Sequence, residues 1–247
     1  MKTISNGKCR ICGMEFSRAG ITRHTLSCVS NVDMSEGIPE KGKLFDIFIT
    51  DRWMKEFWLM VEISEKENLS TLDNFLRKIW CECCGHLSEF EINGKSYYSM
   101  SASDLSQCFF NDGKTMDYPL KKVLEEGSKF GYTYDFGSST ELVLEVKKVR
   151  EGSVPKKREV RLLSRNKMPA LVCSACKKRN AAYINSFAHY EDDVLYLCSS
   201  CAKKVEEGDF EEDDLLAEVE DGALLPVCNS PRMGVCGYEG EFDRWND

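Results

Sequence analysis

The middle of the chain alternates between strand-like and helix-like patterns of hydrophobic positions. Residues 57–63 form a nearly continuous apolar run rich in β-forming residues, which predicts a largely buried strand. Apolar residues then recur at helical spacing, which places them on one face of an amphipathic helix with its N-cap at Ser70. The residues on this face are Leu72, Phe75, Leu76, Ile79 and Trp80.

The following residues predict further strands and tight turns. The Asn93-Gly94 pair is typical of a two-residue β-hairpin. Residues 119–126 predict a short helix, and residues 129–136 and 141–149 predict two strands joined by a turn. We therefore expect an α+β fold in which a central, mainly antiparallel sheet is accompanied by an amphipathic helix.

Composition narrows the class of protein. Hydrophobic residues make up 42% of the 247 residues, which is enough for a packed core. No apolar run approaches the roughly 18 residues of a membrane-spanning helix, and the first residues lack the apolar stretch of a secretory signal. We expect a cytoplasmic protein with no membrane partner, whose 13 cysteines stay reduced and can serve as metal ligands.

Charge is distributed in blocks. Residues 1–30 carry five basic residues and one acidic residue, and residues 151–180 carry nine and two. Residues 205–221 carry ten acidic residues and no basic one. The net charge of −8 is the sum of these opposed blocks, so it does not exclude an anionic partner.

Four candidate metal ligands lie within the first 30 residues. Cys9 and Cys12 are separated by two residues, and His24 and Cys28 follow at the spacing of one helical turn. Such ligands can converge on a tetrahedral zinc ion. The segment resembles the Cys-Cys-His-Cys variant of the zinc-finger family. The gap before His24 is eleven residues where the family has twelve, so the family's base-contacting positions do not transfer.

A second set of candidate ligands consists of two cysteine pairs. Cys173 and Cys176 form the first pair and Cys198 and Cys201 the second, with strand-forming residues between them. This arrangement resembles a zinc ribbon, which is a closed structural site without an open position for a substrate.

A third group of cysteines follows the predicted helix. Cys83, Cys84 and His86 are too close in sequence to form a four-ligand site alone, but Cys228 and Cys236 could complete one. Two alternatives stay open. These thiols are small core residues at a helix end, or one of them is a reactive thiol with His86 as its base.

The C-terminal residues predict a defined turn structure that takes part in this third group. Pro231, Gly234 and Gly237 favour turns over regular structure, and Arg232 offers a rigid fork for a carboxylate or phosphate. We expect this segment to fold back near residues 83–86 and to enclose a pocket or a metal ion there. The alternative is a segment that becomes ordered only with a partner.

Several segments of the central region are similar to known sequences. They are Phe57-Trp-Leu, the 72–80 helix, residues 83–92, residues 120–130 and Tyr132-Thr-Tyr-Asp-Phe-Gly137. Together they resemble the plasmid pRiA4b ORF-3-like family, whose members are labelled as mobile-element passengers. The resemblance implies an α+β domain over residues 44–150 and no established activity. Relatives continue after Gly137 with a Trp and a His, whereas this chain has Ser138-Ser-Thr-Glu-Leu142.

These observations predict an α+β domain flanked by two small zinc-binding modules. The expected segments are a zinc finger (1–30), a linker (31–43), the ORF-3-like domain (44–150), a basic linker (151–169), a zinc ribbon (170–204), an acidic linker (205–224) and a C-terminal tail (225–247).

The expected function is binding, without catalysis. Two closed zinc sites are expected. A third zinc ion is expected if Cys83, Cys84 and His86 form a site together with Cys228 and Cys236. The expected partner is DNA or RNA, or a protein associated with nucleic acid. The alternatives are a protein–protein adaptor with structural zinc ions, and an enzyme that uses Cys83, Cys84, His86 and Arg232. The candidate residues for nucleic-acid contacts are Lys8, Arg10, Arg18, Arg23, Lys156, Lys157 and Arg158.

Overall fold

The chain forms two compact units. The computed structural model describes residues 5–35, 41–101, 103–104, 113–153, 160–186, 194–211, 215–220 and 222–240. The first unit comprises Met1–Lys78 and His86–Lys167, and the second comprises Ile79–Gly85 and Met168–Asp247. No helix in the described ranges is long and apolar enough to cross a membrane.

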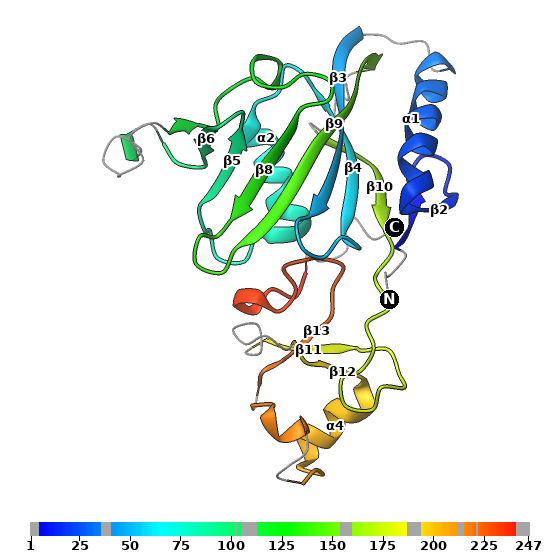
Figure 1. The fold of residues 1–247 in the computed structure, drawn as a ribbon, viewed down its shortest axis with the longest axis vertical. Coiled ribbons are helices and arrows are strands. Elements are labelled where there is room, and N and C mark those ends of the chain that lie inside the picture. Colours follow the sequence, from blue (N-terminus) through cyan, green and yellow to red (C-terminus); the bar gives the residue numbers. More distant parts are fainter. Residues whose placement is uncertain are drawn as a thin grey trace. The chain divides into compact units, whose positions relative to one another are not determined.

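A single sheet dominates the first unit (Figure 1). Within the described residues its order is β2-β1-β10-β4-β3-β9-β8-β5-β6-β7, and every neighbouring pair is antiparallel except β6 and β7. The strands are β1 (Asn6–Cys9), β2 (Glu15–Ser17), β3 (Lys41–Asp51), β4 (Trp58–Ser64), β5 (Ser88–Ile92), β6 (Lys95–Tyr98), β7 (Lys114–Thr115), β8 (Lys129–Tyr134), β9 (Thr140–Ser153) and β10 (Val160–Asn166).

The helices of the first unit flank this sheet (Figure 1). The first, α1 (Arg18–Ser35), contacts β1, β2 and β10. The second, α2 (Leu69–Leu76), buries its apolar face and continues directly into a π-helical turn, η1 (Arg77–Cys81). A single 3₁₀ turn, η2 (Leu120–Lys122), precedes β8.

The N-terminal hairpin is part of this sheet, because residues 7–9 of β1 pair with residues 164–166 of β10. Gly7 on β1 lies so close to its neighbours that a Cβ atom there would be 2.2 Å from the Trp58 ring and 2.4 Å from the Arg165 carbonyl oxygen. Trp58 is fully buried and donates a 2.8 Å hydrogen bond from Nε1 to Ser5 Oγ. Residues 5–30 of the predicted zinc finger are therefore built onto the large sheet.

Buried charges connect the four neighbouring strands β10, β4, β3 and β9. Asp46 on β3 and Glu62 on β4 are fully buried and pair with Arg150 on β9, whose Nε lies 2.9 Å from Asp46 Oδ2. Glu62 Oε1 also lies 2.9 Å from Arg161 Nε on β10. Each charge has an opposite partner, which offsets the cost of removing it from water.

The second unit has its own small sheet, in the order β12-β11-β13 with antiparallel neighbours. An apolar cluster that includes Leu195, Leu197, Leu216 and Val219 lies at its centre. The elements of this unit are β11 (Tyr183–Asn185), β12 (Tyr196–Leu197), α4 (Ser199–Glu207), the 3₁₀ turn η4 (Leu215–Glu218), β13 (Leu224–Pro226) and the 3₁₀ turn η5 (Val235–Gly237).

The predicted α+β fold with a mainly antiparallel sheet is confirmed. The predicted strands are present as β4, β8 and β9. The predicted hairpin is β5–β6, and its turn residues Asn93 and Gly94 have φ values of 52° and 71°. Positive φ at both positions is what a type I′ turn requires.

Other local predictions were wrong in detail. The helix begins at Leu69 with Asn68 as its N-cap, so Ser70 lies inside it. Residues 119–126 contain only the short turn η2. The segment predicted as a basic linker contains β10, whose register shifts between Leu162 and Ser164. This bulge breaks the alternation by which a strand is recognised in sequence.

Candidate metal centres

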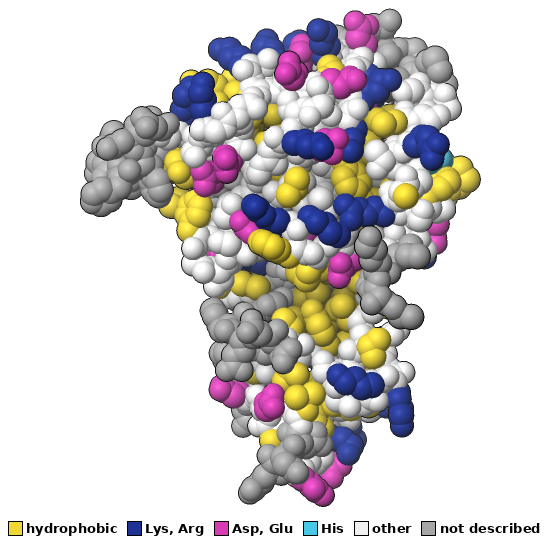
Figure 2. Space-filling model, viewed as in Figure 1, with side chains coloured by type: hydrophobic (Ala, Val, Ile, Leu, Met, Phe, Trp, Pro, Cys, Tyr) yellow, Lys and Arg dark blue, Asp and Glu magenta, His cyan; other side chains and the backbone are white. Residues whose placement is uncertain are grey.

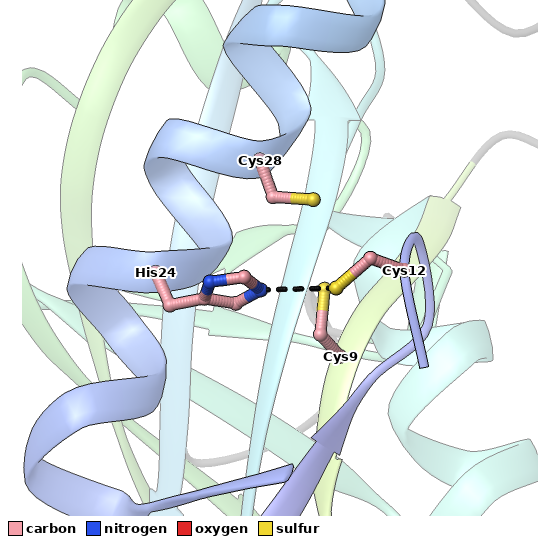
Figure 3. Close-up of side chains that lie close together, drawn as sticks. All are labelled: Cys9, Cys12, His24 and Cys28. Carbon is pink, nitrogen blue, oxygen red and sulfur yellow. Dashed lines mark hydrogen bonds between the residues drawn. The ribbon is translucent and has the colours of Figure 1, made fainter. Parts of the chain in front are cut away.

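The N-terminal cluster consists of Cys9, Cys12, His24 and Cys28, whose ligand atoms all lie within 4.8 Å of one another. Figure 3 shows the two thiols of the β1–β2 hairpin facing the two ligands of α1. Cys12 Sγ lies 3.2 Å from His24 Nε2. A thiolate and an imidazole on one tetrahedral zinc ion would be about 3.6 Å apart, so a small adjustment accommodates the ion.

Local structure holds these four ligands in place. The Cys9 N–H donates to the Met14 carbonyl and the Gly13 N–H donates to the Cys9 carbonyl, which closes a tight turn at the first two thiols. Gly13 has φ +77°, a conformation that favours glycine. The Phe16 ring stacks on His24 with centroids 4.1 Å apart and fixes the imidazole plane.

The surroundings of Cys12 and Cys28 shift the pKa values of their thiols in opposite directions. A backbone hydrogen bond at Met14 lowers the pKa of Cys12. Burial raises the pKa of Cys28 to about 12. A bound cation would supply the charge that stabilises all three thiolates together, since a metal deprotonates its thiol ligands.

The C-terminal cluster consists of Cys173, Cys176, Cys198 and Cys201, again with all ligand atoms within 4.8 Å. Cys176 Sγ and Cys198 Sγ are 3.9 Å apart. Two thiolates on a tetrahedral zinc ion would be about 3.8 Å apart. Cys198 is the N-cap residue of α4, and Cys201 lies in its first turn. Three of the four cysteines are buried in the apolar cluster of the second unit.

Backbone hydrogen bonds define the turn that contains Cys176. The Lys177 N–H donates to the Cys173 carbonyl, and Lys177 itself has φ +54°. Backbone hydrogen bonds from Lys178 and Arg179 lower the pKa of the Cys176 thiol to about 6. This thiol is thus prepared for the thiolate form that a metal requires.

A third cluster contains Cys83, Cys84, His86 and Cys236, with ligand atoms within 4.8 Å. The sequence predicted Cys228 as a member, but it is not in this group among the described residues. Cys228 follows β13 and packs closely on Gly240, since a Cβ atom added to Gly240 would be 2.7 Å from Cys228 Cβ. The three clusters could each hold a metal ion.

The structure separates the predicted nucleic-acid candidates into different environments. Lys8 and Arg23 are exposed, and Arg10 is half-buried. Arg18 is used inside the first unit: its guanidinium donates to the Lys55 carbonyl at 2.9 Å, and burial lowers its pKa. Lys156, Lys157 and Arg158 lie outside the described residues.

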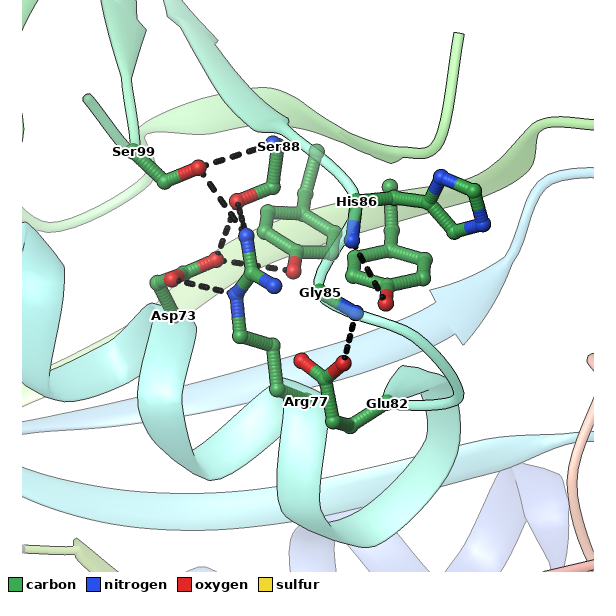
Figure 4. Close-up of polar contacts among 9 residues, drawn as sticks. Asp73, Arg77, Glu82, Gly85, His86, Ser88 and Ser99 are labelled. Carbon is green, nitrogen blue, oxygen red and sulfur yellow. Dashed lines mark hydrogen bonds and ion pairs between the residues drawn. The ribbon is translucent and has the colours of Figure 1, made fainter. Parts of the chain in front are cut away.

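Sequence patterns did not reveal a buried polar network centred on Asp73, a residue of α2 (Figure 4). Its carboxylate accepts hydrogen bonds from Ser88 Oγ at 2.6 Å, Tyr132 OH at 2.9 Å and Arg77 Nε at 2.8 Å. Arg77 also donates to Ser99 Oγ. Arg77 is four residues from Asp73, whereas Ser88 and Tyr132 are 15 and 59 residues away in sequence. The only sequence signal for the network is a carboxylate at a position on α2 next to apolar, buried residues.

A histidine–carboxylate pair lies at the end of β8. His86 Nε2 is 3.5 Å from Asp135 Oδ2, and the Asp135 side chain also accepts a hydrogen bond from the Gly137 N–H at 2.9 Å. This second bond forms the turn after β8, in which Asp135 has φ +65°. Carboxylates commonly orient histidines that bind metals, so the pair is consistent with His86 as a ligand.

The architecture and the clusters define an α+β protein with cysteine-rich candidate metal centres. The family model described as "Plasmid pRiA4b ORF-3-like protein" matches residues 47–174, which is more than half of the chain. The chain therefore belongs to the plasmid pRiA4b ORF-3-like protein family. The match includes β10 and reaches Cys173, whereas the N-terminal cluster precedes it.

Comparison with other proteins adds little about function. No curated protein matches the chain. Among solved structures, it is similar to a protein of unknown function from Methanosarcina mazei Go1, with 14% sequence identity and a TM-score of 0.43. That similarity covers 69% of this chain and 85% of the other.

Proposed function

We propose that this protein is a zinc-stabilised binding module for nucleic acid. One zinc ion is bound by Cys9, Cys12, His24 and Cys28. A second is bound by the cysteine pairs at 173/176 and 198/201. Both donor sets consist of thiolates with at most one imidazole, the combination that favours zinc over hard, oxygen-preferring cations.

The two zinc sites support a structural role. Each has four protein ligands, so a tetrahedral ion has no position left for water or a substrate. Cys9 is fully buried in an apolar cluster with Ile21 and Val29, and Cys173 is fully buried in the cluster of the second unit. Ions at these places stabilise packing, as expected for a binding protein.

The observation that carries the nucleic-acid proposal is the turn that surrounds Cys176. Lys177, Lys178 and Arg179 are consecutive, and all three are exposed. The backbone of the same residues is fixed by hydrogen bonds to the Cys173 carbonyl and to Cys176 Sγ. Lys and Arg side chains also lie on the visible surfaces of both units (Figure 2). Cations presented from a rigid turn are suited to phosphate groups.

The proposal is tested by the salt dependence of binding. Fluorescence anisotropy with labelled single- and double-stranded DNA and RNA gives the log–log slope of affinity against salt concentration. Changing Lys177, Lys178 and Arg179 to Ala should lower that slope on duplex DNA by about 2 to 3, since each phosphate contact contributes about 0.9. A matched control changes three exposed lysines of the first unit, Lys66, Lys121 and Lys122, to Ala.

The control variant should keep the wild-type slope. An equal loss in both variants would mean that only net charge matters, and no salt-sensitive binding at about 50 mM salt would refute the nucleic-acid proposal. The same assay on the Lys156, Lys157 and Arg158 variant tests the remaining basic segment. A protein that fails all of these assays would be better explained as a protein–protein adaptor with structural zinc ions.

A further inference from the structure

The third cluster differs from the other two in joining segments that are far apart in sequence. Cys83 and Cys84 follow the π-helical turn η1, whereas Cys236 lies in η5, about 150 residues later. Cys83 Sγ and Cys84 Sγ are 3.4 Å apart. That separation is close to the roughly 3.8 Å expected of two thiolates on one tetrahedral zinc ion.

The backbone around the cluster is held in unusual conformations. Cys236 has φ +50°, between Gly234 at +82° and Gly237 at +72°. Residues with a Cβ atom adopt this region infrequently, and local contacts must stabilise it. A bond from Cys236 Sγ to a metal ion would be such a constraint.

Hydrogen bonds also fix the C-terminal segment against the end of η1. Trp80 Nε1 donates to the Asn229 carbonyl at 3.0 Å, and Ser230 Oγ donates to the Trp80 carbonyl at 2.7 Å. The Arg232 N–H in turn donates to Ser230 Oγ at 2.9 Å. These contacts lie within the second unit and bring Cys236 to the two adjacent thiols.

Arg232 places a permanent positive charge beside this cluster. Its side chain is fully buried, and its Nη2 lies 3.4 Å from Cys83 Sγ. The guanidinium stays protonated at all ordinary pH values. Three thiolates on a divalent ion leave one net negative charge, which the buried guanidinium would balance.

We propose that Cys83, Cys84 and Cys236 bind a third zinc ion that fastens the C-terminal segment to the end of η1, with Arg232 as the charge-balancing residue. Cys84 and Cys236 are exposed, unlike most ligands of the C-terminal cluster, so this ion is the first to leave when a chelator is added. The inference does not depend on the two ions of the proposed function, which use other cysteines.

Native mass spectrometry of the full chain tests the third site. Wild-type protein should carry three zinc ions and the Cys84→Ser variant two, while the Cys228→Ser control should keep three. Cys84 is exposed, so its replacement should not disturb packing. Limited chelation of the wild type should remove one ion first and raise amide exchange in residues 225–240 before it affects residues 173–201.

Two results would overturn the inference. One is an equal zinc content in the Cys84→Ser and Cys228→Ser variants. The other is a first chelated ion whose loss leaves residues 225–240 protected. A wild-type protein with two ions that are lost only on changing Cys12 or Cys176 would refute the third site and leave the proposed function standing.

Discussion

The N-terminal and C-terminal clusters have nearly the same ligand chemistry but very different surroundings. The hairpin that carries Cys9 and Cys12 continues the large sheet, and its apolar cluster includes Trp58 and Met60 from β4. The C-terminal cluster belongs to a small sheet, and buried cysteines make up part of its apolar core.

This difference determines how much each region depends on its metal. Strand pairing with β10 and the contacts of Trp58 hold the N-terminal hairpin without using its four ligand side chains, so we expect the hairpin to persist when the ion is removed. The second unit has strands of only two or three residues, and three buried cysteines form part of its apolar cluster. Small domains of this kind usually need a metal or disulfides to fold.

The largest effect should follow from Cys176→Ser. The variant loses a ligand of the C-terminal site, and zinc sites of this type supply on the order of 10 kcal/mol of folding free energy in small modules. Hydrogen exchange should show loss of protection throughout residues 173–208, while β3 and β9 stay protected. Retained protection of β11 and α4 in the zinc-free variant would show that the small core suffices.

Cys12→Ser changes the equivalent position of the N-terminal site and should have a smaller effect. Zinc is lost and exchange rises in the turn at residues 9–14 and in α1. The amides of β1 should remain protected because their partners on β10 are unaffected. Hydrogen exchange on this variant, with Cys228→Ser as control, measures the contrast. Equal loss of protection of β1 in the Cys12 variant and of β11 in the Cys176 variant would contradict the proposed difference between the two sites.

Gly7→Ala should detach the hairpin from the sheet without touching a ligand. The new Cβ atom would meet the Trp58 ring and the Arg165 carbonyl oxygen. Overpacking of this kind costs about 1–3 kcal/mol. Hydrogen exchange of the β1 amides measures this loss of stability. Gly20→Ala is the matched control, because its Cβ has no neighbour nearer than 3.8 Å and alanine favours the helix. A neutral Gly7 variant would mean that Trp58 does not anchor the hairpin.

Ser5→Ala should give the smallest effect. It removes the acceptor of the Trp58 Nε1–H bond, and one such hydrogen bond contributes about 0.5–1.5 kcal/mol. We expect slightly faster exchange in β1 and an unchanged zinc content. A loss of zinc in this variant would show that the ion and the strand pairing are more tightly coupled than the structure indicates.

Structural features that depend on residues close together in sequence could be predicted from the sequence. Fixed spacing groups the ligands of the first two clusters, and the Asn93-Gly94 pair fixes the hairpin between β5 and β6. These features depend on residues a few positions apart, so a pattern in the chain can reveal them.

Features that depend on distant pairing could not be read from the chain. Nothing local indicates that β1 pairs with β10, about 155 residues later, or that Arg161 of a basic segment pairs with the buried Glu62. The grouping of Cys236 with Cys83 and Cys84 likewise joins segments about 150 residues apart, and spacing alone does not choose Cys236 over Cys228.

The zinc content of the Cys84→Ser variant tests the central claim most directly, since this variant lacks the proposed third site and retains the other two clusters. A native mass spectrum of the folded chain should show two zinc ions, and adding either Cys12→Ser or Cys176→Ser should reduce the count to one. A folded Cys84→Ser chain that carries fewer than two ions would contradict the assignment of both clusters as structural zinc sites.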